Sequence, residues 1–230
     1  MFQSACATIR DATYALYASS QILNRGRFDS TGTAFMIAPG ILVTAAHQIH
    51  VELNRQEPIL SKFEVIRASD AGQNLESASY IGEDIVRDIA FLKINNPRSD
   101  SCVVLESNII PTGTCCGSLG FPFSSISQTP DGIRFDAIPR FQGAHISSFH
   151  PFLVDSKPLD FYETDSVTYP GSSGCPGFLV NGNVFGMLVL SFPYESVKDK
   201  GEEKPNIGTR IAISLWVPSM DIINFARKIT

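Results

Sequence analysis

The chain has 230 residues, enough for one large domain or two small ones with a sizeable buried core. Hydrophobic residues make up 43% of it and charged residues 18%, proportions that are typical of a globular protein. The net charge is −5 and no basic run is present, which argues against nucleic acid as a partner. No apolar run approaches the roughly 18 residues that a membrane-spanning helix needs, so we expect no membrane partner.

The start of the chain and its cysteines predict a reducing compartment. Met1–Cys6 lacks the basic start and the long apolar run of a signal peptide. The 5 cysteines are odd in number, and none has the spacing of a paired metal ligand. We therefore expect a cytoplasmic protein whose buried thiols act as small apolar fillers, with no metal and no cofactor.

Short apolar runs separated by Gly, Pro, Asn, Asp and Ser dominate the first half of the chain, a pattern typical of strands and turns. Residues 1–12 fit a short helix that leads into the first strand. Pro39-Gly40 separates two apolar runs and predicts a hairpin. The predicted strands of this half are Tyr14–Tyr17, Thr33–Ala38, Ile41–Ala45, Phe63–Arg67, Leu75–Ile81 and Ile89–Ile94.

The second half continues the pattern and ends in a helix. Its predicted strands are Cys102–Glu106, Thr114–Phe121, Gly132–Ile138, Phe141–Phe149, Leu159–Glu163, Gly177–Val180, Val184–Ser191 and Ile207–Ser214. The charged segment Tyr194–Asn206 predicts a solvated loop. Apolar residues at helical spacing, from Ile222 to Ile229, predict a helix over 219–229. About a dozen strands indicate an all-β, closed architecture, and two barrels of similar size fit the length.

Three polar residues stand in settings that suit catalysis. His47 ends a buried apolar run, Asp88 directly precedes another, and Ser173 lies in a tight turn between Gly171 and Gly174. Each alone also has a structural explanation, as a strand-end histidine, a turn aspartate or a Ser/Gly-rich turn. Together they follow the order His, Asp, Ser of one group of hydrolytic triads. The N–H groups of Gly171 and Ser173 are then candidates for an oxyanion hole.

Several sequence blocks carry a resemblance to a known family. They are Thr31–Phe35 with Thr44–His47, Asp88–Ile94, Gly117–Pro122, Gly143–Ser148, Glu163–Pro176 and Val217–Ser219. On these blocks the chain resembles a trypsin-fold serine protease of clan PA, in particular the HtrA (Deg) type without a PDZ domain. The match runs from about Gly32 to Ser219, and the block from Glu163 to Pro176 aligns without gaps.

The resemblance implies an architecture. It implies two six-stranded antiparallel β-barrels in the chymotrypsin-like arrangement, followed by a C-terminal α-helix. The expected organisation is a single trypsin-like peptidase domain over 1–230. Its N-terminal barrel would cover about 1–105, its C-terminal barrel about 110–216 and its helix 219–229.

The resemblance also implies roles for the candidate residues. Ser173 would be the nucleophile, His47 the general base and Asp88 the group that orients the imidazole. The N–H groups of Gly171 and Ser173 would bind the oxyanion. The residues expected to pair with the substrate backbone are Val189, Leu190 and Ser191.

Substrate preference follows from the residues that align with the primary pocket. Val167 would form its floor, with Thr168 beside it, and an uncharged floor of this size argues against Arg or Lys before the cut. We therefore expect a small or medium apolar residue at that position of a protein or peptide substrate.

At three positions the chain differs from the family it resembles or from secreted trypsins, and these differences bear on how its activity would be controlled. Cys175 replaces a glycine, and a packed, inert thiol is favoured over an oxidant sensor. Ser172 replaces the aspartate that activates secreted trypsins, so that route is absent. Gln48 replaces the cysteine of their disulfide. Regulation would then come from a protein partner or from Tyr194–Asn206 acting as a lid or a partner-responsive loop. The alternative for this segment is a plain solvated loop without such a role.

Two rival functions remain beside a serine endopeptidase. One is a catalytically inactive protease fold that serves as a binding module, although all three triad residues are present. The other is a cysteine protease of the same fold, which would carry Cys in place of Ser173 and is therefore disfavoured.

Overall fold

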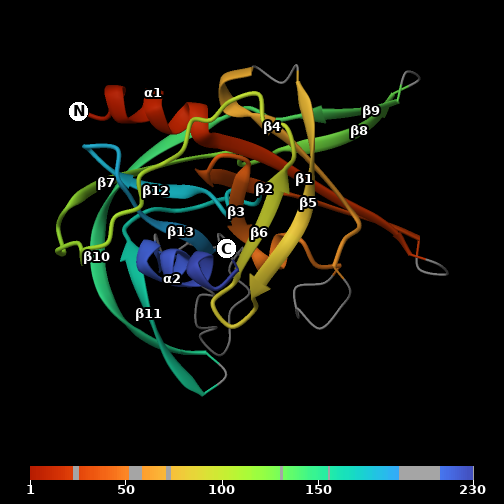
Figure 1. The fold of residues 1–230 in the computed structure, drawn as a ribbon. Helices are drawn as coiled ribbons and strands as arrows, with labels where there is room; N and C mark the ends of the chain where they lie inside the picture. Colours follow the sequence, from red (N-terminus) through yellow and green to blue (C-terminus); the bar gives the residue numbers. More distant parts are fainter. Residues whose placement is uncertain are drawn as a thin grey trace, which may run out of the picture.

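The computed structural model describes residues 1–22, 26–51, 59–70, 74–129, 132–154, 156–191 and 213–229. The described chain is mostly β, with helix α1 (Gln3–Ala12) at its start and helix α2 (Ser219–Ile229) at its end (Figure 1). Short 3₁₀ turns follow two of the strands, at η1 (Ala46–Gln48) and η2 (Ala68–Asp70). No helix in the described part of the chain is long and apolar enough to cross a bilayer.

The first half forms a closed barrel. Its strands are β1 (Thr13–Ile22), β2 (Gly26–Ala38), β3 (Ile41–Ala45), β4 (Lys62–Arg67), β5 (Leu75–Asp84) and β6 (Ile89–Ile94). They are ordered β1-β2-β3-β6-β5-β4, and antiparallel pairing of β4 with β1 closes the ring. The predicted hairpin is confirmed: Ala38 pairs with Ile41, and Gly40 takes a positive φ of 75° that suits glycine.

The second half forms a ring of similar strand number. Its strands are β7 (Cys115–Gly120), β10 (Arg140–Val154), β11 (Lys157–Thr164), β12 (Pro176–Leu179), β13 (Val184–Ser191) and β14 (Ser214–Pro218). The order is β10-β11-β14-β13-β12-β7, and β7 pairs back to β10. The ladders that join β11 to β14 and β12 to β7 contain three residue pairs each.

A separate two-stranded ribbon leaves this second ring. It consists of β8 (Ser125–Thr129) and β9 (Gly132–Asp136), and it projects from the body of the molecule at the upper right of Figure 1. Phe135 of β9 packs against Tyr17 of β1, with ring centroids 5.9 Å apart. The predicted mainly β fold with a C-terminal helix is confirmed, and this ribbon is an addition to it.

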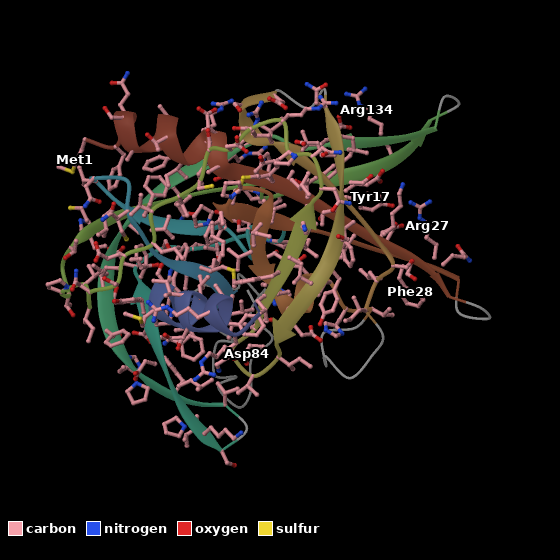
Figure 2. All side chains as sticks on the ribbon, viewed as in Figure 1. Met1, Tyr17, Arg27, Phe28, Asp84 and Arg134 are labelled. Carbon is pink, nitrogen blue, oxygen red and sulfur yellow. The ribbon has the colours of Figure 1, made fainter. Side chains whose placement is uncertain are left out.

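One hydrophobic core extends through both halves. It joins Phe35 and Phe91 of the first barrel to Phe178 and Val217 of the second half, and it includes Ile222 of α2. All five side chains are at most 1% exposed. A smaller cluster lies within the second half, formed around Trp216, Phe185 and Tyr162. Side chains fill the space that the strands enclose (Figure 2).

Helix α2, at the end of the described chain, contacts both halves. Its Phe225 packs on Phe91 of β6 at 5.2 Å between ring centroids. The Ser219 hydroxyl donates a 2.6 Å hydrogen bond to the Val184 carbonyl of β13. Asp221 in the first turn and basic residues in the last complement the helix dipole.

Three expectations about strands need correction. Cys102–Glu106 is not a strand of either sheet: Val103 donates to Met36 and Glu106 to Val184, so the segment bridges the two halves without forming a ladder. Strand β8 was not predicted, because its short polar sequence shows no apolar alternation. The last strand starts at Ser214, where the prediction ended, and most of Ile207–Ser214 lies outside the described residues. The Tyr194–Asn206 segment also lies outside them.

Candidate active site

The loop that carries Ser173 depends on glycine at two positions. Gly171 and Gly174 have φ angles of 91° and 84°, in the left-handed region. A Cβ atom on Gly171 would stand 2.5 Å from the Phe121 carbonyl oxygen, and one on Gly174 would stand 2.0 Å from that of Thr33. No side chain fits at either position, so this path of the backbone requires glycine at both.

The N–H groups of the loop alternate between bonded and free. Ser172 donates to the Tyr169 carbonyl at 3.0 Å, and Gly174 donates to the Leu188 carbonyl at 2.8 Å. Among the described residues, the N–H groups of Gly171 and Ser173 have no acceptor. Two free backbone donors beside a serine hydroxyl are the equipment of an oxyanion hole.

Thr33 of β2 fastens this loop to the first barrel. Its backbone N–H donates to the Ser173 carbonyl at 2.9 Å, and its hydroxyl donates to the Gly171 carbonyl at 2.8 Å. The same hydroxyl accepts the Phe121 N–H at 3.0 Å. Sequence reasoning used Thr33 only as part of a matching block and missed this role, which joins residues 138 positions apart.

His47 and Asp88 are in direct contact. His47 lies in η1, directly after β3, and Asp88 directly precedes β6. The Nδ1 atom of His47 is 2.7 Å from Oδ2 of Asp88, and the His47 backbone N–H donates to Oδ1 at 2.8 Å. The two side chains are 12% and 6% exposed, so water screens the contact weakly.

Asp88 takes a backbone conformation that few non-glycine residues adopt. Its φ is 61°, in the left-handed region that Asp and Asn tolerate better than most residues. Its carbonyl accepts the Ala46 N–H at 3.1 Å, which joins the two turns. Next to it, Arg87 forms ion pairs with Asp84 at 3.1 Å and with Asp221 of α2 at 3.2 Å. The turn is thus held from both sides.

The other ring nitrogen of His47 has a partner that the sequence did not suggest. Its Nε2 atom lies 2.9 Å from Nε2 of Gln48. Among the described residues, the Ser173 hydroxyl has no hydrogen bond, so it is not paired with His47 in this structure. The two turns are nevertheless adjacent, because a Cβ on Gly174 would lie 3.1 Å from the Ala45 nitrogen.

Val167 and Thr168 lie between β11 and the serine loop. The Val167 carbonyl accepts a 2.7 Å hydrogen bond from Gln142 of β10. Thr168 is buried, and its hydroxyl accepts a 3.3 Å hydrogen bond from Ser214 of β14. Their backbone is therefore well fixed, but which residues form a primary pocket stays a prediction.

The predicted substrate-pairing residues lie at the end of β13. The ladder with β12 reaches Met187, and Leu188 then exchanges hydrogen bonds with Gly174 and Cys175. Beyond Leu188 no described strand pairs with this edge. Val189 sits at a bulge and is buried, whereas Leu190 is 49% exposed. Ser191 ends the strand.

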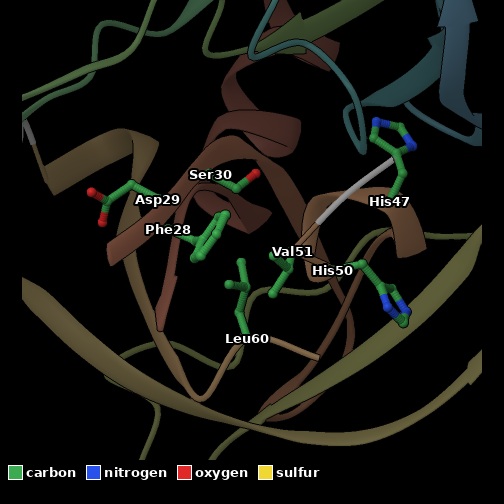
Figure 3. Close-up of a pocket in the computed structure, with 7 residues that line it drawn as sticks. All are labelled: Phe28, Asp29, Ser30, His47, His50, Val51 and Leu60. Atoms are coloured by element: carbon green, nitrogen blue, oxygen red, sulfur yellow. The ribbon is translucent and has the colours of Figure 1, made fainter. Parts of the chain in front are cut away.

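A cavity of about 140 Å³ adjoins His47 on the side of the first barrel. It is lined by Phe28, Asp29, Ser30, His47, His50, Val51 and Leu60 (Figure 3). Figure 3 shows His47 at one rim, with Phe28, Val51 and Leu60 gathered at the centre. Its wall thus combines three apolar side chains with four polar or titratable ones.

Cys175 packs inside the second half. It is 2% exposed, and burial raises the pKa of its thiol. A Cβ on Gly120 would lie 2.9 Å from the Cys175 Cβ, so the facing strand leaves room only for glycine. Because the thiolate is the reactive form, this thiol acts as an apolar filler. All five cysteines are free, and among the described residues no cluster of His, Cys, Asp or Glu could hold a metal ion.

Comparison with known proteins places this arrangement in context. A family model described as "Trypsin-like peptidase domain" matches residues 32–187. The chain is 25% identical over 159 residues to a probable periplasmic serine endoprotease DegP-like of Halomonas elongata, and 28% identical over 159 residues to one of Pseudomonas savastanoi pv. phaseolicola. These matches cover 69% of this chain but 29% and 28% of the two relatives.

Solved structures share the fold. An HtrA-type protease, AlgW with tripeptide, superposes with a TM-score of 0.73 at 21% identity, covering 100% of this chain and 63% of that one. The Rv3671c protease from M. tuberculosis, active form, gives 0.68 at 19% identity, with coverages of 98% and 83%. The predicted resemblance to the HtrA (Deg) type is thereby confirmed. The curated relatives are named as periplasmic, which does not support the predicted cytoplasmic location of this chain. That location stays a prediction.

Proposed function

The chain belongs to the family of trypsin-like peptidase domains, and from this premise we propose that it is a serine endopeptidase that uses His47, Asp88 and Ser173 as its catalytic triad. The observation that carries the proposal is the backbone of the serine loop, in which the N–H groups of Gly171 and Ser173 have no acceptor among the described residues. The contact of His47 with Asp88 supports it.

The proposed reaction begins with attack of the Ser173 hydroxyl oxygen on the carbonyl carbon of the scissile peptide. His47 accepts the hydroxyl proton at Nε2 and later delivers it to the leaving amine, which yields an acyl-enzyme. Water then attacks the ester, again with His47 as the base. Asp88 stabilises the imidazolium in both steps, because its carboxylate accepts from Nδ1 in a site largely closed to water.

The developing oxyanion would accept from the N–H groups of Gly171 and Ser173. The peptide groups that carry these two N–H donors are held on their carbonyl side, because the Pro170 carbonyl accepts from Phe123 at 2.9 Å and the Ser172 carbonyl accepts from Cys175 at 3.0 Å. Loss of one such donor typically lowers kcat by about 10²–10³-fold. Fixed donors of this kind favour the transition state over the planar substrate carbonyl.

The substrate would lie along the free edge of β13. Its backbone would pair with Val189, Leu190 and Ser191 as an added strand. The residue before the cut would point toward Val167 and Thr168, both uncharged, so a small or medium apolar residue is the proposed preference. We also propose that a protein partner regulates the chain. For the chain itself we propose a cytoplasmic location.

A fluorophosphonate probe tests the proposal directly. The native chain should label at one serine, Ser173→Ala should not label, and Ser172→Ala should label normally, because a backbone hydrogen bond holds that neighbouring residue. Lack of Ser173-dependent labelling under all conditions would favour the inactive binding module instead. A peptide library tests the preference, and cleavage after Arg or Lys would contradict it.

A further inference from the structure

Gln48 is enclosed in a site that fits its side chain. The residue is 8% exposed. Its Oε1 atom accepts a 3.0 Å hydrogen bond from the Ser30 hydroxyl, and its Nε2 atom lies 2.9 Å from Nε2 of His47. A Cβ on Gly32 would stand 2.7 Å from Oε1 of Gln48, so glycine at that position leaves the room that the carboxamide needs.

The chemistry of the carboxamide sets the protonation of His47. An amide NH₂ group only donates, so Nε2 of His47 must be the acceptor. The ring proton is then on Nδ1, where it is donated to Asp88. This is the tautomer that a general base requires. Its one free lone pair is, however, already taken by Gln48.

The same lone pair is where the proton of Ser173 has to go. Because the Ser173 hydroxyl has no hydrogen bond among the described residues, the base and the nucleophile are present but uncoupled. We propose that Gln48 is a positioning residue that holds His47 in a resting state, and that the carboxamide must leave Nε2 before His47 and Ser173 can react. This inference rests on the proposed endopeptidase function.

An open cavity adjoins the two partners of the carboxamide, although Gln48 itself does not line it. Ser30 and His47, the two partners of the carboxamide, both line the cavity of about 140 Å³ (Figure 3). The charged groups near His47 in the described chain are Asp88, and around the cavity Asp29 and His50. Asp29 accepts from Tyr17 and Arg27, and His50 contacts Glu83 at 2.7 Å. Substitution of Gln48 leaves all of these groups in place.

Rates of fluorophosphonate labelling across pH test the proposal. Gln48→Met keeps the bulk but removes the donor, and should label faster by about 2- to 10-fold, the range expected when one competing hydrogen bond is lost. Ser30→Ala should give a smaller increase. Gln48→Glu offers an acceptor that favours the imidazolium, so labelling should be slower at neutral pH and its pH midpoint should rise by about one unit or more.

A purely structural role predicts a different result. Gln48→Met and Gln48→Glu would then both slow labelling in step with lost thermal stability, and the pH midpoint would not move. That outcome would overturn the inference.

A second readout separates this inference from the proposed function. In a chain that carries Ser173→Ala, the ¹⁵N resonance of His47 Nε2 should shift when Gln48→Met is added. An unchanged resonance contradicts the Gln48 contact whatever the enzyme does. If no variant labels but the resonance shifts, the endopeptidase proposal fails while the contact stands.

Discussion

Asp88 combines a buried carboxylate that contacts His47 with an unusual backbone conformation. Its carboxylate receives both the ring and the backbone N–H of His47, while its own φ of 61° is costly for most side chains. Left-handed backbone costs about 1–2 kcal/mol for an ordinary L-residue, and Asp and Asn reduce that cost. The choice of residue at this position therefore serves both conformation and charge.

Two substitutions of Asp88 separate these contributions. Asp88→Asn keeps the left-handed preference but cannot stabilise an imidazolium, so kcat should fall by about 10⁴-fold. Asp88→Ala should lose as much activity and be less stable than Asp88→Asn by about 1–2 kcal/mol, because its backbone is strained. Urea unfolding and peptide hydrolysis measure the two effects. Equal stability of the two variants would contradict the argument about the backbone.

Thr33 offers a second test at the same scale. Thr33→Val removes the hydroxyl that donates to Gly171 and accepts from Phe121, and leaves two buried backbone groups without partners. We expect a loss of about 1–3 kcal/mol of unfolding free energy per unsatisfied group, together with slower labelling of Ser173. Thr33→Ser retains the hydroxyl and is the matched control. If both variants behaved like the native chain, the loop would not depend on this contact.

The sequence predicted part of this site because its residues fall in short local patterns. His47, Asp88 and Ser173 each border an apolar run or a glycine turn, which can be recognised without coordinates. The contacts of Thr33 and Gln48 could not be predicted in this way. They depend on which side chains meet after the two halves of the chain have folded together, as when Thr33 meets Gly171.

At the scale of elements, the segment before β7 shows where pattern reading fails. Cys102–Glu106 has the composition of a strand, but Val103 donates to Met36 of the first barrel, whereas Val104 and Glu106 bond only with Val184 of the second half. A β-ladder needs one partner strand along its whole length, whereas this segment bonds to β2 at one end and to β13 at the other. By contrast, β6 and β13 have the predicted bounds, because each is a mostly apolar run that begins directly after an Asp or Asn.

Glu106 fastens this bridging segment and makes it sensitive to acid. Its carboxylate accepts from the Asn183 side chain at 3.0 Å and from the backbone N–H groups of Ser107 and Asn108. The hydrogen bond from Asn183, followed by those from Asn108 and Ser107, holds the pKa of Glu106 below its ordinary value of 4.5. A lowered pKa means that this stabilisation is present above pH 4.5 and is lost as the pH falls through the lower, folded-state value.

We therefore expect Glu106→Gln to flatten the acid side of the stability profile. Between about pH 5 and pH 3 the native chain should lose more unfolding free energy than the variant, by no more than about 1 kcal/mol, because the carboxylate is partly solvated. Urea unfolding at several pH values measures this difference. Asn183→Ala removes the largest cause and should give part of the same flattening, whereas parallel profiles for all three proteins would exclude the role of Glu106.

At the scale of the whole molecule, the two halves are joined by more than the candidate site. The main core runs from Phe35 and Phe91 to Phe178 and Val217 without interruption. Helix α2 adds a second connection through Phe225 on Phe91 and Ser219 on Val184. Neither half buries its own apolar surface completely without the other, so we expect them to unfold together.

The single tryptophan makes this cooperativity measurable. Trp216 is 2% exposed and packs against Phe185 in the second half, so its fluorescence reports on that half alone. Circular dichroism in the far ultraviolet reports on the strands of both halves. One joint transition requires the two signals to share a urea midpoint.

A substitution confined to the first barrel makes the test stringent. Leu92 of β6 is fully buried, and Leu92→Ala should cost about 2–5 kcal/mol of unfolding free energy. If the halves are coupled through the shared core, the midpoint of Trp216 fluorescence moves as far as that of circular dichroism, although Leu92 lies in the other half. Fluorescence that keeps the native midpoint while circular dichroism splits into two steps would show that each half folds alone. The serine loop would then depend on Thr33 and its neighbouring contacts for its attachment to His47, since the shared core would no longer hold the halves in register.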